Sequence, residues 1–212
     1  MGGILQRVSD QAAELPTVAG FNGPFASASP LGRRRLLWIA GLAALALWIF
    51  LAVQDRKISD TPGPGIIPFE VAGTSEHARE ILDDWGDEGR DAARVSLIAD
   101  YPYLVAYSIF LAVGCTISAE RLGRAGMARL ARIGAPLGWA QFVAGACDAI
   151  EDAALLRVLD GHTDFYPGVA LVAAVGKFAL AGLGVAYVIL GAVIGRRAPE
   201  SEDEPAPQPE AQ

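Results

Sequence analysis

Three acidic side chains, Asp148, Glu151 and Asp152, interrupt a stretch of the chain that otherwise has the composition of a membrane-spanning helix. Because an α-helix has 3.6 residues per turn, these positions lie within about 100° of arc on one helix face. Gln141, seven residues before Asp148, falls on the same face. Carboxylates held in an apolar setting bind cations, exchange protons or act as an acid and base pair. The spacing therefore predicts an ionisable site on one side of this segment.

Two further segments carry polar residues that such a site needs. Asp100, Tyr103 and Tyr107 recur at intervals of three and four residues, so they share one face of a second helix. Lys177 lies in a third apolar segment, where Leu180 is the one large residue on its helix face. The small residues on that face are Ala173, Ala174, Ala181 and Gly184. Small side chains let helices approach closely, so we expect this face to meet another helix.

Counting along the segments places Lys177 and Asp148 at similar depths. Lys177 lies about eight residues, or ~12 Å, inside the outer end of its segment. Asp148 has a comparable depth if its helix continues to Arg157, which predicts a Lys177–Asp148 or Lys177–Glu151 ion pair. Each unpaired charge at the bilayer centre costs about 2.5–3.5 kcal/mol, so pairing, protonation or a wet cavity must offset that cost.

Two other interpretations of the acids remain open. If the segment spans only 130–150, the acids lie at the outer water interface and Lys177 extends toward them along its alkyl chain. Alternatively, the polar faces meet another membrane protein and form an assembly interface. The binding site predicts that the acids point into the bundle, whereas the other two interpretations predict that they point outward.

Composition indicates the elements that position these residues. The chain has 212 residues, of which 52% are hydrophobic and 19% charged, and the charges lie in patches between long apolar runs. A membrane span needs about 20 apolar residues, which fits segments at 36–53, 101–118, 133–152 and 169–194. We therefore expect an all-α fold: a four-helix transmembrane bundle with an extracytoplasmic amphipathic helix between spans 1 and 2.

Few features indicate a cofactor, a metal or nucleic acid. Cys115 and Cys147 fall within spans without a metal-binding spacing, so we interpret them as packing residues. His77 and His162 lie outside the spans and are too few for a histidine-rich site. The net charge of -7 comes largely from one loop and the tail, which does not favour nucleic-acid binding. No cofactor, metal site or nucleic-acid partner is predicted.

Arginines indicate the orientation, because basic residues collect on the cytoplasmic side of a membrane. They precede the first span, occupy the 119–132 connection and follow the last span. This pattern predicts a bacterial cytoplasmic (inner) membrane protein with both termini in the cytoplasm. Residues 1–34 are expected to be a flexible segment, 35–195 the membrane domain with an uncleaved first span, and 196–212 a disordered acidic tail.

The 54–100 loop on the outer side contains an amphipathic helix at 73–86. Its apolar residues recur with helical spacing, Thr74 or Ser75 caps its start, and Gly86 ends it. The residues of the apolar face are Ala78, Ile81, Leu82 and Trp85. We expect this helix to lie on the outer membrane surface with Trp85 at the interface. The preceding sequence IIPFEV, which contains Glu70, fits either an extended piece or a short helix.

Three sequences together carry a resemblance: FEVAGTSEHAREILDDWG, ADYPYLVAY and GACDAIEDAALL. Over residues 69–195 the chain resembles an uncharacterised family of bacterial four-span integral membrane proteins, with an AGT-x-E-x-A loop helix and a D-x-x-E pair. The resemblance implies that Asp100, Asp148 and Glu151 belong to one recurring arrangement. Where relatives often have Asn, this chain has Asp152, which adds a charge.

Three functions fit these observations. The first is binding or transport of a small cation, a proton or an amphipathic ligand in an outward-facing pocket of Asp100, Tyr103, Tyr107, Asp148, Glu151, Asp152 and Lys177. The second is a non-catalytic subunit that pairs with another membrane protein or with a copy of itself. The third is a membrane enzyme using the paired acids, which ranks last because the sequence shows no nucleophile with a base, no metal cluster and no phosphate loop.

Overall fold

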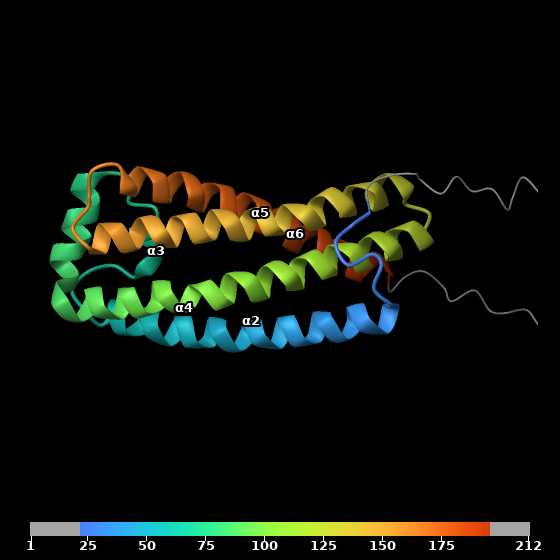
Figure 1. The fold of residues 1–212 in the computed structure, drawn as a ribbon, viewed down its shortest axis with the longest axis horizontal. Helices are drawn as coiled ribbons and strands as arrows, with labels where there is room; N and C mark the ends of the chain where they lie inside the picture. Colours follow the sequence, from blue (N-terminus) through green and yellow to red (C-terminus); the bar gives the residue numbers. More distant parts are fainter. Residues whose placement is uncertain (1–21, 196–212) are drawn as a thin grey trace, which may run out of the picture.

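The computed structural model describes residues 22–195, which are helical throughout apart from connecting turns, with no strand in that range. The elements in chain order are α2 (Pro30–Ser59), α3 (Ile66–Glu70), α4 (Ser75–Arg124), α5 (Ala128–Leu159) and α6 (Tyr166–Gly195). The four long helices lie side by side along the long axis of the molecule, and α3 lies near one end (Figure 1). Both ends of the described chain lie at the opposite end (Figure 1).

Three of these helices, α2, α4 and α6, are long and apolar enough to cross a membrane. They contain the predicted spans 36–53, 101–118 and 169–194. Large apolar side chains on α2 and α6 point away from the rest of the molecule and are more than half exposed: Trp38, Ile39, Leu42, Val172, Leu183 and Ile189. Water would make such extended apolar surfaces unfavourable, whereas acyl chains would cover them. The predicted span 133–152 lies inside α5, which has charged residues toward both ends and is not one of the three.

Helix α4 changes direction at Gly86, where φ is 60° and ψ is -161°. This backbone conformation is open almost only to glycine, so the helix predicted at 73–86 ends where expected. Its start is also as expected, because the Thr74 side chain accepts a hydrogen bond from the backbone N–H of His77 at 3.3 Å. The part of α4 before Gly86 runs across the end of the molecule (Figure 1).

The apolar face of that first part of α4 packs onto the bundle rather than onto a membrane surface. Trp85 is only 2% exposed, its ring lies 4.9 Å from that of Phe69, and its indole N–H donates to Pro64 O at 2.5 Å. The prediction that Trp85 lies at the membrane interface is therefore wrong. Helical spacing identifies an apolar face, but α3 and the end of α5, with Leu155 and Val158, supply the surface that buries it.

At the opposite end, residues 22–29 pack between α4 and α5. The Thr116 hydroxyl donates to Pro24 O at 2.8 Å, and the Trp139 indole N–H donates to Asn22 O at 3.0 Å. Arg33 is 6% exposed and pairs with Glu120 at 2.6 Å. The described part of the 1–34 segment is thus packed, while residues 1–21 and the predicted tail 196–212 lie outside the described residues.

The small-residue face of α6 meets α5, as predicted. Ala174 is fully buried, and a Cβ atom on Gly184 would lie 2.5 Å from the Gln141 amide nitrogen. That amide donates to Leu137 O at 3.0 Å and to Leu180 O at 3.2 Å, so it links the two helices. Helix α6 packs against α4 and α5, whereas α2 packs mainly against α4. This arrangement leaves a space between α2 and α6.

Candidate functional site

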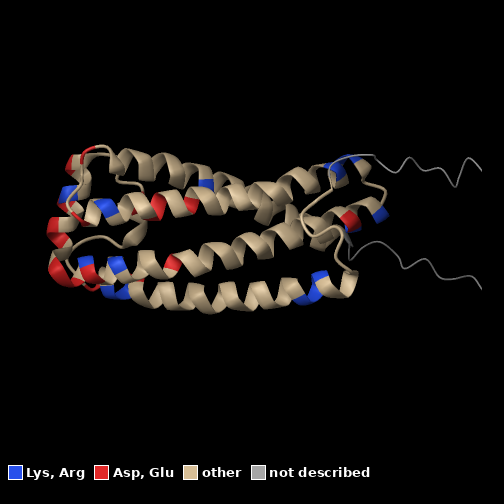
Figure 2. Cartoon of the chain, in the orientation of Figure 1, with Lys and Arg blue, Asp and Glu red and all other residues tan. Residues whose placement is uncertain are grey.

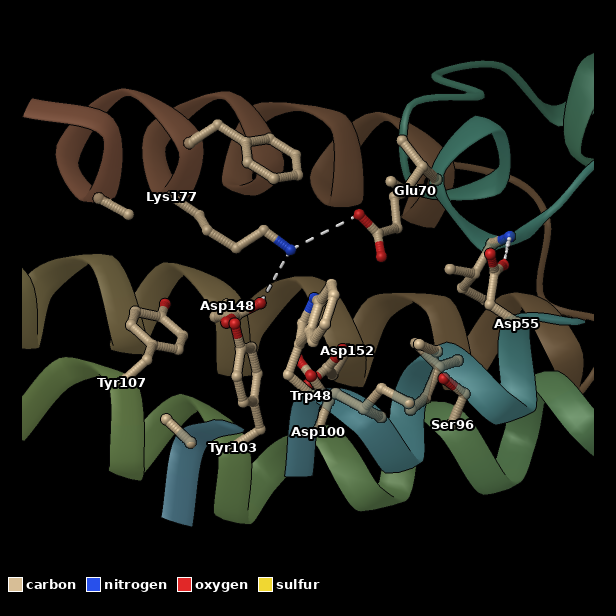
Figure 3. A pocket seen from close by; sticks show the side chains of 18 of the residues that line it. Trp48, Asp55, Glu70, Ser96, Asp100, Tyr103, Tyr107, Asp148, Asp152 and Lys177 are labelled. Carbon is tan, nitrogen blue, oxygen red and sulfur yellow. Dashed lines mark hydrogen bonds and ion pairs between the residues drawn. The ribbon is translucent and has the colours of Figure 1, made fainter. Parts of the chain in front are cut away.

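Lys177 of α6 lies between acidic residues from two other elements. Its ammonium is 2.9 Å from Asp148 Oδ1 and 2.8 Å from Glu151 Oε2, both on α5 (Figure 3 shows the first contact). A third carboxylate, Glu70 Oε2 at the end of α3, is 3.6 Å away. The pairing of Lys177 with Asp148 and Glu151, predicted from their depths in the helices, is confirmed.

The side chains of this ion-pair network are buried. Their exposed fractions are 11% for Lys177, 2% for Asp148 and 0% for Glu151. The contacts between the Lys177 ammonium and these carboxylates are ion pairs. At these values the acids of this segment are shielded from bulk solvent.

A second cluster of acids lies beside the network. Asp100 on α4, together with Asp148 and Asp152 on α5, can each offer an oxygen so that the three atoms lie within 4.8 Å of one another. Asp152 is 3% exposed, and its Oδ2 atom has no hydrogen-bond partner among residues 22–195. Carboxylate oxygens so close together repel one another unless a cation or a proton lies between them.

Tyr103 and Tyr107, which share a face of α4 with Asp100, extend the polar surface away from the acids. The rings of Tyr103 and Tyr107 lie 5.3 Å apart. Tyr107 is 9% exposed, and its hydroxyl has no hydrogen-bond partner in the described part of the chain. Tyr107 lines the same cavity as Asp148, and Figure 3 shows both side chains there.

These groups face a cavity of about 780 Å³. Six of the seven predicted site residues line it; the exception is Glu151, which is fully buried and contacts the Lys177 ammonium. Apolar side chains of α2 and α6 form much of the rest of the wall: Leu45, Trp48, Leu51, Phe178, Ala181 and Val185. The cavity is therefore acidic where Asp100, Asp148 and Asp152 line it, whereas most residues that α2 and α6 contribute are apolar.

Two site residues were not predicted, Glu70 and Asp55. The IIPFE sequence forms the short helix α3, and its N-cap residue Gly65 has no side chain to bind the first backbone N–H groups. Asp55 Oδ1 accepts from the N–H of Ile66 at 2.8 Å and so fixes the start of α3. This placement brings Glu70 to Lys177, where burial raises the pKa of Glu70 and the nearby ammonium opposes that shift. The one signal in the sequence was an acid inside an apolar stretch.

Comparison with protein-family models, curated proteins and solved structures finds no match to this chain. The site itself therefore has to indicate the function. It contains a buried ammonium among an excess of carboxylates, beside an apolar wall.

Proposed function

We propose that this chain is a four-span protein of the bacterial cytoplasmic membrane that binds a cation in a pocket in its outer half. Helices α2, α4, α5 and α6 form the transmembrane bundle, and the first part of α4 is its extracytoplasmic helix. The family resemblance over residues 69–195 fits the same arrangement.

The distribution of charge supports this orientation. At the end that carries Arg33, Arg124 and Arg129, basic side chains predominate, and the opposite end is rich in acids (Figure 2). Basic residues collect on the cytoplasmic side of bacterial membranes. Both ends of the described chain lie at the basic end (Figures 1 and 2), which supports termini in the cytoplasm and a pocket nearer the outer face.

Helix α5 is compatible with a fourth span because its acids turn inward. A carboxylate facing acyl chains is costly, but Asp148 and Glu151 face the Lys177 ammonium instead. Thirty-two residues are ample to cross about 30 Å of hydrocarbon at 1.5 Å per residue.

The single observation that carries the proposed function is the imbalance of charge in a buried site. Among residues 22–195, the Lys177 ammonium faces Glu70, Asp148 and Glu151, while Asp100 and Asp152 lie next to them and make no ion pair with a basic residue. A low-dielectric cavity with excess negative charge attracts cations strongly. We infer that Lys177 holds Asp148 in place and that Asp100 and Asp152 contact the ligand.

The assembly-subunit interpretation is less well supported, because the polar faces of α4 and α5 point into the cavity. A partner recognised through these faces would need them at the outer surface of the bundle.

Binding to the full chain in nanodiscs of zwitterionic lipid tests the proposal. Ethylammonium, Mg²⁺, Ca²⁺ and Mn²⁺ are titrated separately and the heat of binding is recorded. We expect at least one cation to bind, and Asp152→Asn to weaken that binding by about tenfold or more, since a buried charge contact is worth at least ~1.4 kcal/mol. Asp84→Asn, on the exposed side of the outer helix, is the matched control and should change affinity less than about twofold. Failure of every cation to bind, or equal binding by Asp152→Asn, refutes the proposal.

A further inference from the structure

We propose that the ligand of this pocket is an amphipathic amine, with a cationic head at the carboxylates and an apolar chain that reaches the bilayer between α2 and α6. This inference rests on the proposed function and names the chemical class of its ligand.

The cavity is open on the side where α2 and α6 fail to meet. Both helices pack against α4 rather than extensively against each other, and both line the cavity. Large apolar side chains on those walls remain about half exposed, at 52% for Leu45, 55% for Trp48, 49% for Phe178 and 44% for Val185. In a membrane this opening faces acyl chains, so an apolar chain can pass through it without entering water.

The volume of the cavity fits an organic ligand better than an ion. A space of about 780 Å³ falls in the range of small-molecule sites, roughly 300–1,000 Å³. One water occupies about 30 Å³ of liquid, so a metal ion or a proton would leave most of the cavity unused. The apolar wall has no role in binding an ion alone.

The carboxylate-lined end of the cavity suits a positively charged group that donates hydrogen bonds. Asp100, Asp152 and Tyr107 line the cavity, and Asp152 Oδ2 and the Tyr107 hydroxyl have no hydrogen-bond partner within residues 22–195. An ammonium supplies N–H donors to the carboxylates of Asp100 and Asp152, and the ring of Trp48, which also lines the cavity, adds a site for cation–π attraction.

Lys177 disfavours a divalent metal ion at the same place. Of the three carboxylates able to surround an ion, Asp148 already contacts the Lys177 ammonium at 2.9 Å. A metal would have to share that carboxylate with a positive charge, whereas an amine needs only Asp100 and Asp152.

Chain length is the variable that tests the inference. Full-length protein in nanodiscs of zwitterionic lipid is titrated with ethylammonium, dodecylammonium and neutral dodecanol. We expect dodecylammonium to have an apparent affinity about tenfold or more above that of ethylammonium, because the bilayer concentrates it beside the opening. Dodecanol should not displace it, since it lacks the charge.

A variant that fills the opening provides the second arm. Ala181→Trp places an indole on the cavity wall and should abolish the advantage of the longer chain while ethylammonium still binds. Leu183→Trp, on the same helix with a 58% exposed side chain outside the cavity, is the matched control and should leave the advantage unchanged.

Photo-crosslinking tests the same point in the unmodified chain. Dodecylammonium with a diazirine at the end of its alkyl chain should label the facing residues of α2 and α6, among them Leu45 and Val185, and Asp152→Asn should reduce this labelling.

Any one of three results would overturn the proposal of an amphipathic ligand. These are equal affinities for the two amines, an advantage of the longer chain that survives Ala181→Trp, and labelling that is the same in Asp152→Asn. In that case, binding of Mg²⁺ or ethylammonium would still support the proposed function. If no cation binds at all, both proposals fail.

Discussion

At the scale of single residues, Lys177 is the side chain on which the buried site depends. Its ammonium lies 2.9 Å from Asp148 and 2.8 Å from Glu151, and these acids are spaced three residues apart on α5. Desolvating such charges costs several kcal/mol for each ion, and the contacts between them offset this cost only while all partners are present. The network is therefore sensitive to the loss of its one cation.

Replacing Lys177 with Met should lower the free energy of unfolding by about 3–5 kcal/mol, because two buried carboxylates lose their counterion. Chemical unfolding in a mild detergent measures the change. Adding Glu151→Gln to Lys177→Met should recover part of the loss. Lys57→Met, an exposed lysine at the end of α2, is the matched control and should have little effect. A Lys177→Met protein as stable as the wild type would contradict the ion-pair network.

An exposed ion pair predicts a pH dependence of stability. Arg94 donates to Asp160 Oδ1 at 2.7 Å, and this hydrogen bond holds the pKa of Asp160 below its usual range. Because the pKa is lower in the folded than in the unfolded chain, the pair stabilises the fold at neutral pH. That contribution is lost as pH falls below about 4.

Thermal unfolding midpoints of wild type and Asp160→Asn at pH 7, 5 and 3 check this. The wild type should unfold at a higher temperature at pH 7 and 5, and the difference should shrink at pH 3. A difference that does not change with pH would mean that the carboxylate charge is irrelevant.

The ionic core of the site was predictable because two local rules sufficed. Helical spacing put Asp148, Glu151 and Asp152 on one face, and counting residues matched the depth of Lys177. Glu70 was not predictable, because its place beside Lys177 depends on how α3 folds back onto the bundle. The spacing of residues in the sequence does not indicate where α3 packs on the bundle.

At the scale of elements, the contact between α5 and α6 depends on the absence of a side chain at Gly184. The Gln141 amide fills the space that a Cβ atom would need. Its two hydrogen bonds, to Leu137 O and Leu180 O, hold the helices at this separation.

Gly184→Ala should therefore destabilise the protein by about 1–3 kcal/mol, as overpacking of a close contact does. Gly182→Ala, on the same helix, meets nothing within 4 Å and should be neutral or slightly stabilising. Chemical unfolding of both variants makes the comparison. Equal effects of the two substitutions would indicate that the close approach contributes nothing.

Hydropathy located the four long helices but not their ends. The predicted span 133–152 lies within α5, which runs from Ala128 to Leu159. Apolar composition ends where the charges begin, whereas the backbone hydrogen bonds of the helix continue through them. The outer part of α4 was predicted as an amphipathic helix from the spacing of its apolar residues. That spacing does not indicate which surface the apolar face covers.

At the scale of the whole molecule, the two ends differ in charge, and this difference predicts the topology. Arg129 lies in the first turn of α5 and Asp84 in the first part of α4, and both are exposed. These two segments lie at the basic and the acidic end of the molecule, respectively (Figures 1 and 2). Cys115 is fully buried, so replacing the partly exposed Cys147 with Ala leaves a background suited to labelling.

In that background, a membrane-impermeant maleimide added to intact bacterial cells should label Asp84→Cys. Arg129→Cys should react only after the cells are opened. Labelling of Arg129→Cys in intact cells would place the basic end outside and reverse the proposed orientation.

The packed end of the molecule has a consequence for any solute that occupies the cavity. The cavity lining extends along α4 only to Leu111, and Cys115, Leu122 and Tyr187 fill the bundle beyond it, with residues 22–29 closing that end. Within residues 22–195 the cavity is thus closed at this end, so a bound molecule would leave through the same opening by which it entered. For the proposed cation-binding function, this geometry means that occupancy of the pocket would follow the concentration of the solute at that one opening.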